Sequence, residues 1–267
     1  RAEFLPLPKD TRAKLALVAP RGSVNEMKLS WTGELEKPSG YLIRGRFTKV
    51  EMNAPGGWGA FTGLSGELNA SKAGGNLRID AQNAVIELPA VLPEGRARFD
   101  KLAAQIGWAI KDDHVEVKFS NVNLANSDVA GILNGSYSTR SKYPNSPGVV
   151  DLNGRFARAD AKAVYRYIPH LPKVVQDYLK DSIVSGQASD GRLRLKGDLH
   201  EFPWGDGKSG TFQVSARVAN AVFRYAEGWP QLTDVNAELS FDARRMQILA
   251  ARATVLGTRA SNARVQI

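Results

Sequence analysis

A repeated pattern of alternating apolar and polar residues constrains the fold of this chain more than any other feature. The pattern begins at Phe61, at Phe99 and again at Leu232. Each copy has an apolar first residue, an aliphatic residue three positions on, a small residue, Glu or Gln and a second aliphatic residue, then a polar turn and another alternating segment. Alternation with a period of two is typical of β-strands that have one wet and one dry face. The chain is therefore predicted to contain repeated hairpins that share one long apolar face.

The same alternation continues outside the three copies. Aliphatic residues from Leu193 to Leu199 alternate with Arg, Lys and Asp, and the segment from Phe212 to Val218 alternates in the same way. With 267 residues, the chain is long enough for one large β domain or two smaller ones, and long enough to bury a core. These segments predict a mainly β protein.

One part of the chain has the spacing of helices instead. Asp160 is suited to cap a helix over 161–168, which Pro169 stops. Pro172 suits the first turn of a second helix, in which apolar residues recur at helical spacing. Gly186 is a suitable residue to terminate it. The sequence therefore predicts a helical pair between about 160 and 185.

We expect three regions that together form one continuous domain. A β-repeat region over 1–158 starts with a short helix capped by Asp10-Thr11, the helical pair occupies 159–186, and a second β-repeat region fills 187–267. The chain shows no run of about 18 apolar residues that could span a bilayer. We interpret it as a segment of a longer repetitive protein whose targeting or anchoring segment lies elsewhere.

The net charge of +9 and the pI near 9.7 raise the possibility of a nucleic-acid partner. The basic residues are spread along strands such as Arg192 to Lys196 rather than gathered on an arm or a helix, which is typical of the solvated face of a sheet. A stacking platform for single-stranded nucleic acid needs aromatic residues on the charged face. Phe119, Phe212 and Phe241 are instead in phase with Val and Leu. We therefore expect no nucleic-acid partner.

The sequence offers little for catalysis. It has no Cys, and its three histidines lie far apart, with no spacing suited to a metal. Asp112-Asp113-His114 occupies the predicted turn of the second repeat. No nucleophile elbow, phosphate-binding glycine loop or dinucleotide fingerprint is present. We expect a protein that is not an enzyme and has no cofactor and no metal.

The role of the apolar face is left open by periodicity alone. The face could be the closed core of a β-sandwich, or it could line an open groove that holds an apolar ligand. Both need strands with one dry face, so alternation is compatible with either.

The chain contains several short motifs in a fixed order: Ala19-Pro20-Arg21-Gly22, Tyr167-Ile168-Pro169, Gly197-Asp198-Leu199, Phe202-Pro203-Trp204, Gly210-Thr211-Phe212, Tyr225 and Gly228-Trp229-Pro230. Together they resemble the central region of the YhdP proteins, which belong to the AsmA-like family of Gram-negative envelope proteins and are related to TamB. The resemblance runs from about Ala19 to the end of the chain. Tyr178-Leu179 departs from the Trp-Leu pair expected in the second helix.

This resemblance implies a fold, a location and a function that composition does not show. It implies repetitive antiparallel strands in a long, twisted sheet curled into a groove or taco, in the periplasm, tethered to the inner membrane by a segment outside this chain. It further implies that phospholipid acyl chains are carried in the apolar groove between the inner and outer membranes. It supplies no catalytic residue.

We expect the groove to be lined by the apolar residues of the repeats and of the two clearest later strands. The helical pair, through Val174, Tyr178 and Leu179, could plug or brace it, and packing is the favoured role. The alternatives are a periplasmic scaffold or chaperone-like module that binds envelope proteins through its sheet edges, and, less favoured, a carbohydrate-binding β domain. The expected lipid-binding residues are Leu64, Leu68, Leu77, Ile79, Leu102, Ile106, Trp108, Val115, Val117, Phe119, Leu193, Leu195, Phe212, Val214, Val235, Leu239, Phe241, Met246 and Ile248.

Overall fold

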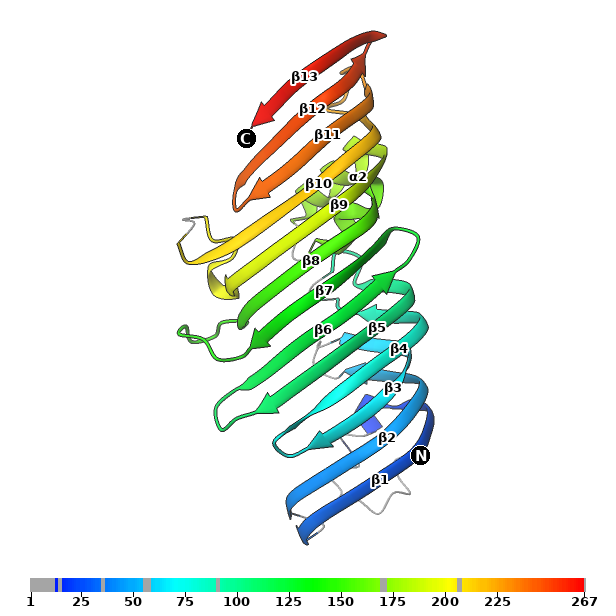
Figure 1. The fold of residues 1–267 in the computed structure, drawn as a ribbon, viewed down its shortest axis with the longest axis vertical. Helices are drawn as coiled ribbons and strands as arrows, with labels where there is room; N and C mark the ends of the chain where they lie inside the picture. Colours follow the sequence, from blue (N-terminus) through cyan, green and yellow to red (C-terminus); the bar gives the residue numbers. More distant parts are fainter. Residues whose placement is uncertain are drawn as a thin grey trace.

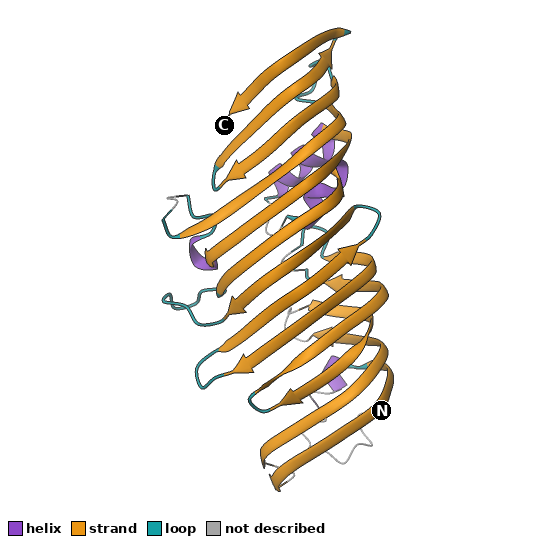
Figure 2. Ribbon diagram, in the orientation of Figure 1, coloured by secondary structure: helices purple, strands orange, loops and turns teal. Residues whose placement is uncertain are grey.

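The computed structural model describes residues 13, 16–34, 37–54, 59–89, 92–168, 172–205 and 208–266. Within them, a single sheet of 13 antiparallel strands follows the order of the sequence without a crossover (Figures 1 and 2). The mainly β prediction is confirmed. The strands are β1 (Arg21–Glu34), β2 (Lys37–Ala54), β3 (Gly59–Ser71), β4 (Gly74–Glu87), β5 (Arg96–Ile110), β6 (Val115–Ala125), β7 (Val129–Ser138), β8 (Val149–Asp160), β9 (Ile183–Asp198), β10 (Gly210–Phe223), β11 (Leu232–Asp242), β12 (Arg245–Val255) and β13 (Thr258–Gln266).

The sheet is open and curled, because many of its strands bend (Figure 1). Lys49, Asn121 and Asn220 have positive φ values of 50°, 50° and 51°, and each lies where the pairing register shifts. Such β-bulges add a residue to one strand and bend it. Asn tolerates a left-handed backbone better than most residues, which explains its place at two of these bends.

A strictly sequential antiparallel sheet has two long rims, because successive connections lie at opposite ends of the strands. We call the connections that follow β1, β3, β5, β7, β9 and β11 the first rim. The connections that follow β2, β4, β6, β8, β10 and β12 form the second rim. The helices η2 (Ala161–Tyr167) and α2 (Lys173–Ser182) belong to the second rim, and η3 (Leu199–Glu201) belongs to the first.

The helical pair is present, with two corrections. Asp160 is the N-cap, and its side chain accepts a hydrogen bond from the Lys162 amide at 3.0 Å, but the element that follows is a short 3-10 helix, as is common in connectors. The prediction that Gly186 ends the second helix is wrong. Helix α2 ends at Ser182, and Gly186 lies inside β9, because strand pairing with β10 begins at Ile183. The predicted stop at Pro169 lies outside the described residues.

The short helix near the start of the chain is described only in part. Ala16 to Val18 are helical, whereas the expected cap at Asp10-Thr11 lies outside the described residues. Within the described residues, no helix is both long and apolar enough to cross a membrane.

Candidate apolar trough

The pairing register places the expected lipid-binding residues on one face of the sheet, which we call the inner face. Directly paired residues of an antiparallel sheet project to the same side. One row runs across four strands, from Leu68 through Leu77 and Ile106 to Phe119.

A second row on the inner face joins four strands of the C-terminal half. Leu193 pairs with Val214, Val214 with Phe241, and Phe241 with Met246. The apolar face predicted from alternation is therefore continuous in space, and the opposite face carries polar rows such as Arg46, Glu67, Arg78 and Gln105.

The expected residues lie at two depths. Leu64, Ile79 and Leu102 are buried in a core cluster where β3, β4 and β5 bend. All the other members of the expected set are half-buried. A closed sandwich would bury most of such a set, whereas here the inner face is packed at the bend and partly accessible elsewhere. We call this face the candidate trough, with the packed bend as its floor and the half-buried rows as its walls.

The total surface supports an open shape. The accessible surface is 17517 Å² for a chain of 29.0 kDa. A compact monomer of this mass exposes about 11,400 Å². A single curled layer raises the exposed area in this way, because within the described residues no second sheet covers its strands.

Large aromatic rings lie flat on the inner face, over glycines of the neighbouring strand. A Cβ atom added to Gly131 would lie 2.5 Å from Cδ1 of Phe156, and one added to Gly75 would lie 2.6 Å from Cζ2 of Trp108. Each glycine is the direct cross-strand partner of the ring that covers it. An aromatic ring that packs over a cross-strand glycine covers backbone that would otherwise be exposed and leaves a smooth apolar surface.

Several inner-face residues were missed by the sequence reasoning. Phe156 and Leu152 lie on β8, where Leu152 pairs directly with Leu195. Phe47, on β2, pairs with Gly66. These strands lie outside the three repeat copies, but their alternation carries the same signal.

A hollow of about 1070 Å³ spans β1 to β6, and residues of both faces line it, among them Leu68, Leu77 and Ile106 of the expected lipid-binding set. Lys118 and Ser120 line this hollow whereas Phe119 between them does not, and Arg78 and Gln105 of the polar rows line it too. Arg44, Arg46 and Glu67 also line it. Such charged walls are unsuited to acyl chains, and on chemical grounds the trough is the better candidate site.

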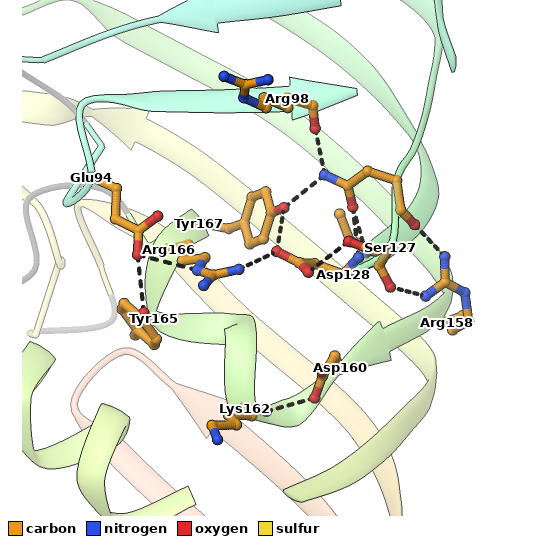
Figure 3. A network of polar contacts seen from close by, with 12 residues as sticks. Glu94, Arg98, Ser127, Asp128, Arg158, Asp160, Lys162, Tyr165, Arg166 and Tyr167 are labelled. Carbon is orange, nitrogen blue, oxygen red and sulfur yellow. Dashed lines mark hydrogen bonds and ion pairs between the residues drawn. The ribbon is translucent and has the colours of Figure 1, made fainter. Parts of the chain in front are cut away.

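A polar network fastens η2 to the hairpins of the second rim (Figure 3). Asp128, in the β6–β7 connection, accepts hydrogen bonds from Arg166 Nη1 at 2.9 Å and from the Tyr167 hydroxyl at 3.1 Å. Glu94, in the β4–β5 connection, accepts from the Tyr165 hydroxyl at 3.0 Å and from Arg166 Nε at 3.1 Å. One turn of helix thus ties together three successive connections of the same rim.

The charges in this network shift one another's pKa values. Partial burial works to raise the pKa of Asp128, but hydrogen bonds from Arg166, Ser127 and Tyr167 outweigh it, so that the pKa lies below its ordinary value. Burial is the main cause that raises the pKa of Tyr167 to about 12. Asp128 therefore stays ionised and Tyr167 protonated at neutral pH, as donor and acceptor roles in the network require.

The histidine of the second repeat lies in a turn, between two carboxylates. His114, in the β5–β6 turn, has its Nδ1 2.5 Å from Asp113 Oδ1 and its Nε2 3.1 Å from Glu116 Oε1. The pKa of His114 is raised, mainly by the hydrogen bond to the Asp113 carboxylate and next by the hydrogen bond to Glu116. Among the described residues, no three His, Asp or Glu side chains come together in a way that could hold a metal ion.

Comparison with known proteins identifies the family. A family model described as YhdP protein matches residues 1–267. The chain is also similar to the "Intermembrane phospholipid transporter YhdP" of Escherichia coli (strain K12), with 26% identity over 207 residues. That alignment covers 74% of this chain and 16% of the relative, so the chain corresponds to a small part of that protein's length. No solved structure matches the chain. Because the family model spans every residue, the chain belongs to the YhdP family.

Proposed function

We propose that this segment is a non-enzymatic lipid conduit, whose inner face holds phospholipid acyl chains during transport between the inner and outer membranes. The observation that carries the proposal is the continuous, half-buried apolar face that runs across the sheet. The relative's description as an intermembrane phospholipid transporter supports the same substrate class.

The physical need for such a face is large. Moving an acyl chain into water costs about 0.8 kcal/mol per CH₂, or on the order of 10 kcal/mol per chain. A trough that keeps the chain against apolar side chains removes most of that barrier and leaves the headgroup in water. Shape and apolar lining are sufficient for this task, so no residue need act in catalysis.

Location and anchoring are part of the same proposal. The segment would lie in the periplasm, and a part of the longer protein outside this chain would tether it to the inner membrane. The helical pair would brace the second rim: η2 is fastened by the network around Asp128, whereas Val174 of α2 is 81% exposed.

Charge placed on the inner face tests the proposal. Ile106→Asp and Leu195→Glu put a carboxylate on the trough wall and should sharply lower the amount of phospholipid that purifies with the protein, measured by mass spectrometry. Gln105→Asp and Gln213→Glu are matched controls, because they place the same charge one residue away on the exposed outer face and should retain lipid. If the inner-face variants fold and hold as much lipid as the parent, the proposal is wrong.

A protein-binding scaffold is the second candidate function. This alternative needs an accessible strand edge in the sheet. A strand edge of this kind can pair with another chain. Under this alternative, the purified protein carries no stoichiometric phospholipid and the four variants behave alike.

A further inference from the structure

The described part of the loop that follows β9, residues 199–205, lies over the inner face at the first rim. Trp204 is 1% exposed, and its ring covers Gly197 and Gly210, which pair with each other. A Cβ added to Gly197 would lie 2.7 Å from Cε2 of this ring, and one added to Gly210 would lie 2.5 Å from Cδ2. Gly197 follows Leu195 by two residues on β9, and Gly210 precedes Phe212 by two residues on β10. The Trp204 ring therefore occupies the next inner-face row toward the first rim.

A buried carboxylate holds this loop in place. Asp198 accepts hydrogen bonds from the Ser141 hydroxyl, from Ser146 Oγ at 2.5 Å and from the His200 amide at 3.0 Å. The main-chain carbonyl of Asp198 accepts from Trp204 Nε1 at 2.8 Å. The indole is therefore fixed by its own strand end and, through Asp198, by the adjacent β7–β8 connection.

Phe202 lies on the accessible side of the same cluster. Its ring centroid is 5.2 Å from that of Trp204, nearly perpendicular at 88°, and 5.4 Å from that of Phe212. Phe202 is 43% exposed, whereas Trp204 is covered. An exposed ring that continues an apolar face is suited to contact an apolar ligand.

The second rim covers the other end of the same strands. A Cβ added to Gly186 of β9 would lie 2.8 Å from the Cβ of Ala221 and 3.4 Å from that of Ala161, the first residue of η2. Ala221 is 7% exposed. Between the two covers, the inner face of β9 and β10 presents Leu193 and Leu195 with their partners.

We propose that Phe202 is an acyl-chain contact and that Trp204 is a fixed lip, which together with η2 confines the chains to the central rows of β9 and β10. Those rows carry Leu193, Leu195, Phe212 and Val214. The inference rests on the proposed lipid-conduit function. It adds that the covers at β9 and β10 determine the width of the lipid path there. It selects for slender, flexible ligands such as acyl chains, because rigid covers stand at both rims.

Photoreactive aromatic residues test this arrangement with little change of shape. Benzoylphenylalanine is placed singly at Phe202, Phe212 and Trp204, the protein is loaded from phospholipid vesicles, and lipid adducts are counted by mass spectrometry after illumination. Positions 202 and 212 should form adducts. Position 204 should stay at background, as should Tyr143, a ring on the same rim that stacks on His200 at 4.6 Å. Because the bulky probe at 204 could disturb folding, Phe202→Asp in the protein labelled at 212 is a second test, and it should lower the adduct severalfold whereas Tyr143→Asp leaves it unchanged.

The outcomes separate this inference from the function on which it rests. Adducts at 204 as abundant as at 202, or adducts at 212 but none at 202, would overturn the lip and contact roles while leaving the conduit intact. An unchanged adduct at 212 in the Phe202→Asp variant would do the same. If no position forms an adduct, including one at Ile106, the conduit itself fails.

Discussion

The same Leu→Ala substitution at two inner-face positions should have very different costs. Leu102 is 8% exposed and belongs to the core cluster at the bend, whereas Leu195 is half-buried on the trough wall. Enclosed Leu→Ala changes cost about 2–5 kcal/mol, because a cavity is left behind. Full burial of a Leu side chain is worth about 1.5–3 kcal/mol, so a half-buried wall residue with open space above it should cost about 1 kcal/mol.

The expected difference between Leu102→Ala and Leu195→Ala is therefore on the order of 2 kcal/mol. For a domain of this size, that corresponds to a gap in Tm of about 4–8 °C. The assay is urea unfolding of delipidated protein, followed both by circular dichroism and by Trp fluorescence. Coincidence of the two transitions shows whether a single free energy of unfolding applies, which is needed because sheets built from repeated hairpins can unfold in parts.

Two results would refute the reasoning. A cost above about 2 kcal/mol at both positions would mean that Leu195 is enclosed, as in a closed sandwich. A cost near 1 kcal/mol at both would mean that the bend has no packed floor. Either result would remove the distinction between floor and wall.

Three other predictions concern the surroundings of the trough. Asp128→Asn should cost about 1–2 kcal/mol of stability, because it weakens a charged hydrogen-bond network, whereas Asp100→Asn on the exposed face should stay within about 0.5 kcal/mol in the same unfolding assay. The pKa of His114 is raised in the fold, so its stabilising effect is fully present below its unfolded value of about 6.5 and is lost as pH rises through the folded pKa. Unfolding measured from pH 5 to 9 should show this loss in the parent and not in His114→Gln. Gly131→Ala should cost about 1–3 kcal/mol, because the added Cβ would lie 2.5 Å from the Phe156 ring and 2.6 Å from the Arg155 carbonyl oxygen. Gly107→Ala, whose added Cβ meets its nearest atom at 4.0 Å, should be neutral or stabilise by up to about 1 kcal/mol, and equal effects would contradict the close approach at Gly131.

The strands and their faces could be predicted from local pattern, because alternation is a property of each strand by itself. Leu193 and Val214 were assigned to one dry face from their own neighbours, and they pair directly in the fold. The curl could not be derived in this way. It arises at bulges such as those at Lys49 and Asn121, where a single residue changes the register, and a Lys in a strand carries no signal for a bend.

Two other features depended on contacts between distant parts of the chain. Gly186 has the local character of a helix terminator, but pairing between β9 and β10 places it inside a strand. Trp204 stands in a loop with Pro and Gly and has no periodicity, so its position over two glycines could not be read from spacing. Whether the inner face lines a groove was likewise left open by the pattern. The motifs that resemble YhdP proteins favoured the groove, which stays a prediction that the lipid experiments test.

The central claim is that acyl chains lie on one face of the sheet, and a crosslinking scan along a single strand tests it most directly. A photoreactive residue is placed in turn at positions 105, 106, 107 and 108 of β5, and lipid adducts are measured in protein loaded with phospholipid. The account predicts adducts at 106 and 108 and none at 105 and 107, a period of two that follows the inner face. Adducts that are absent, or equally abundant at all four positions, would contradict it.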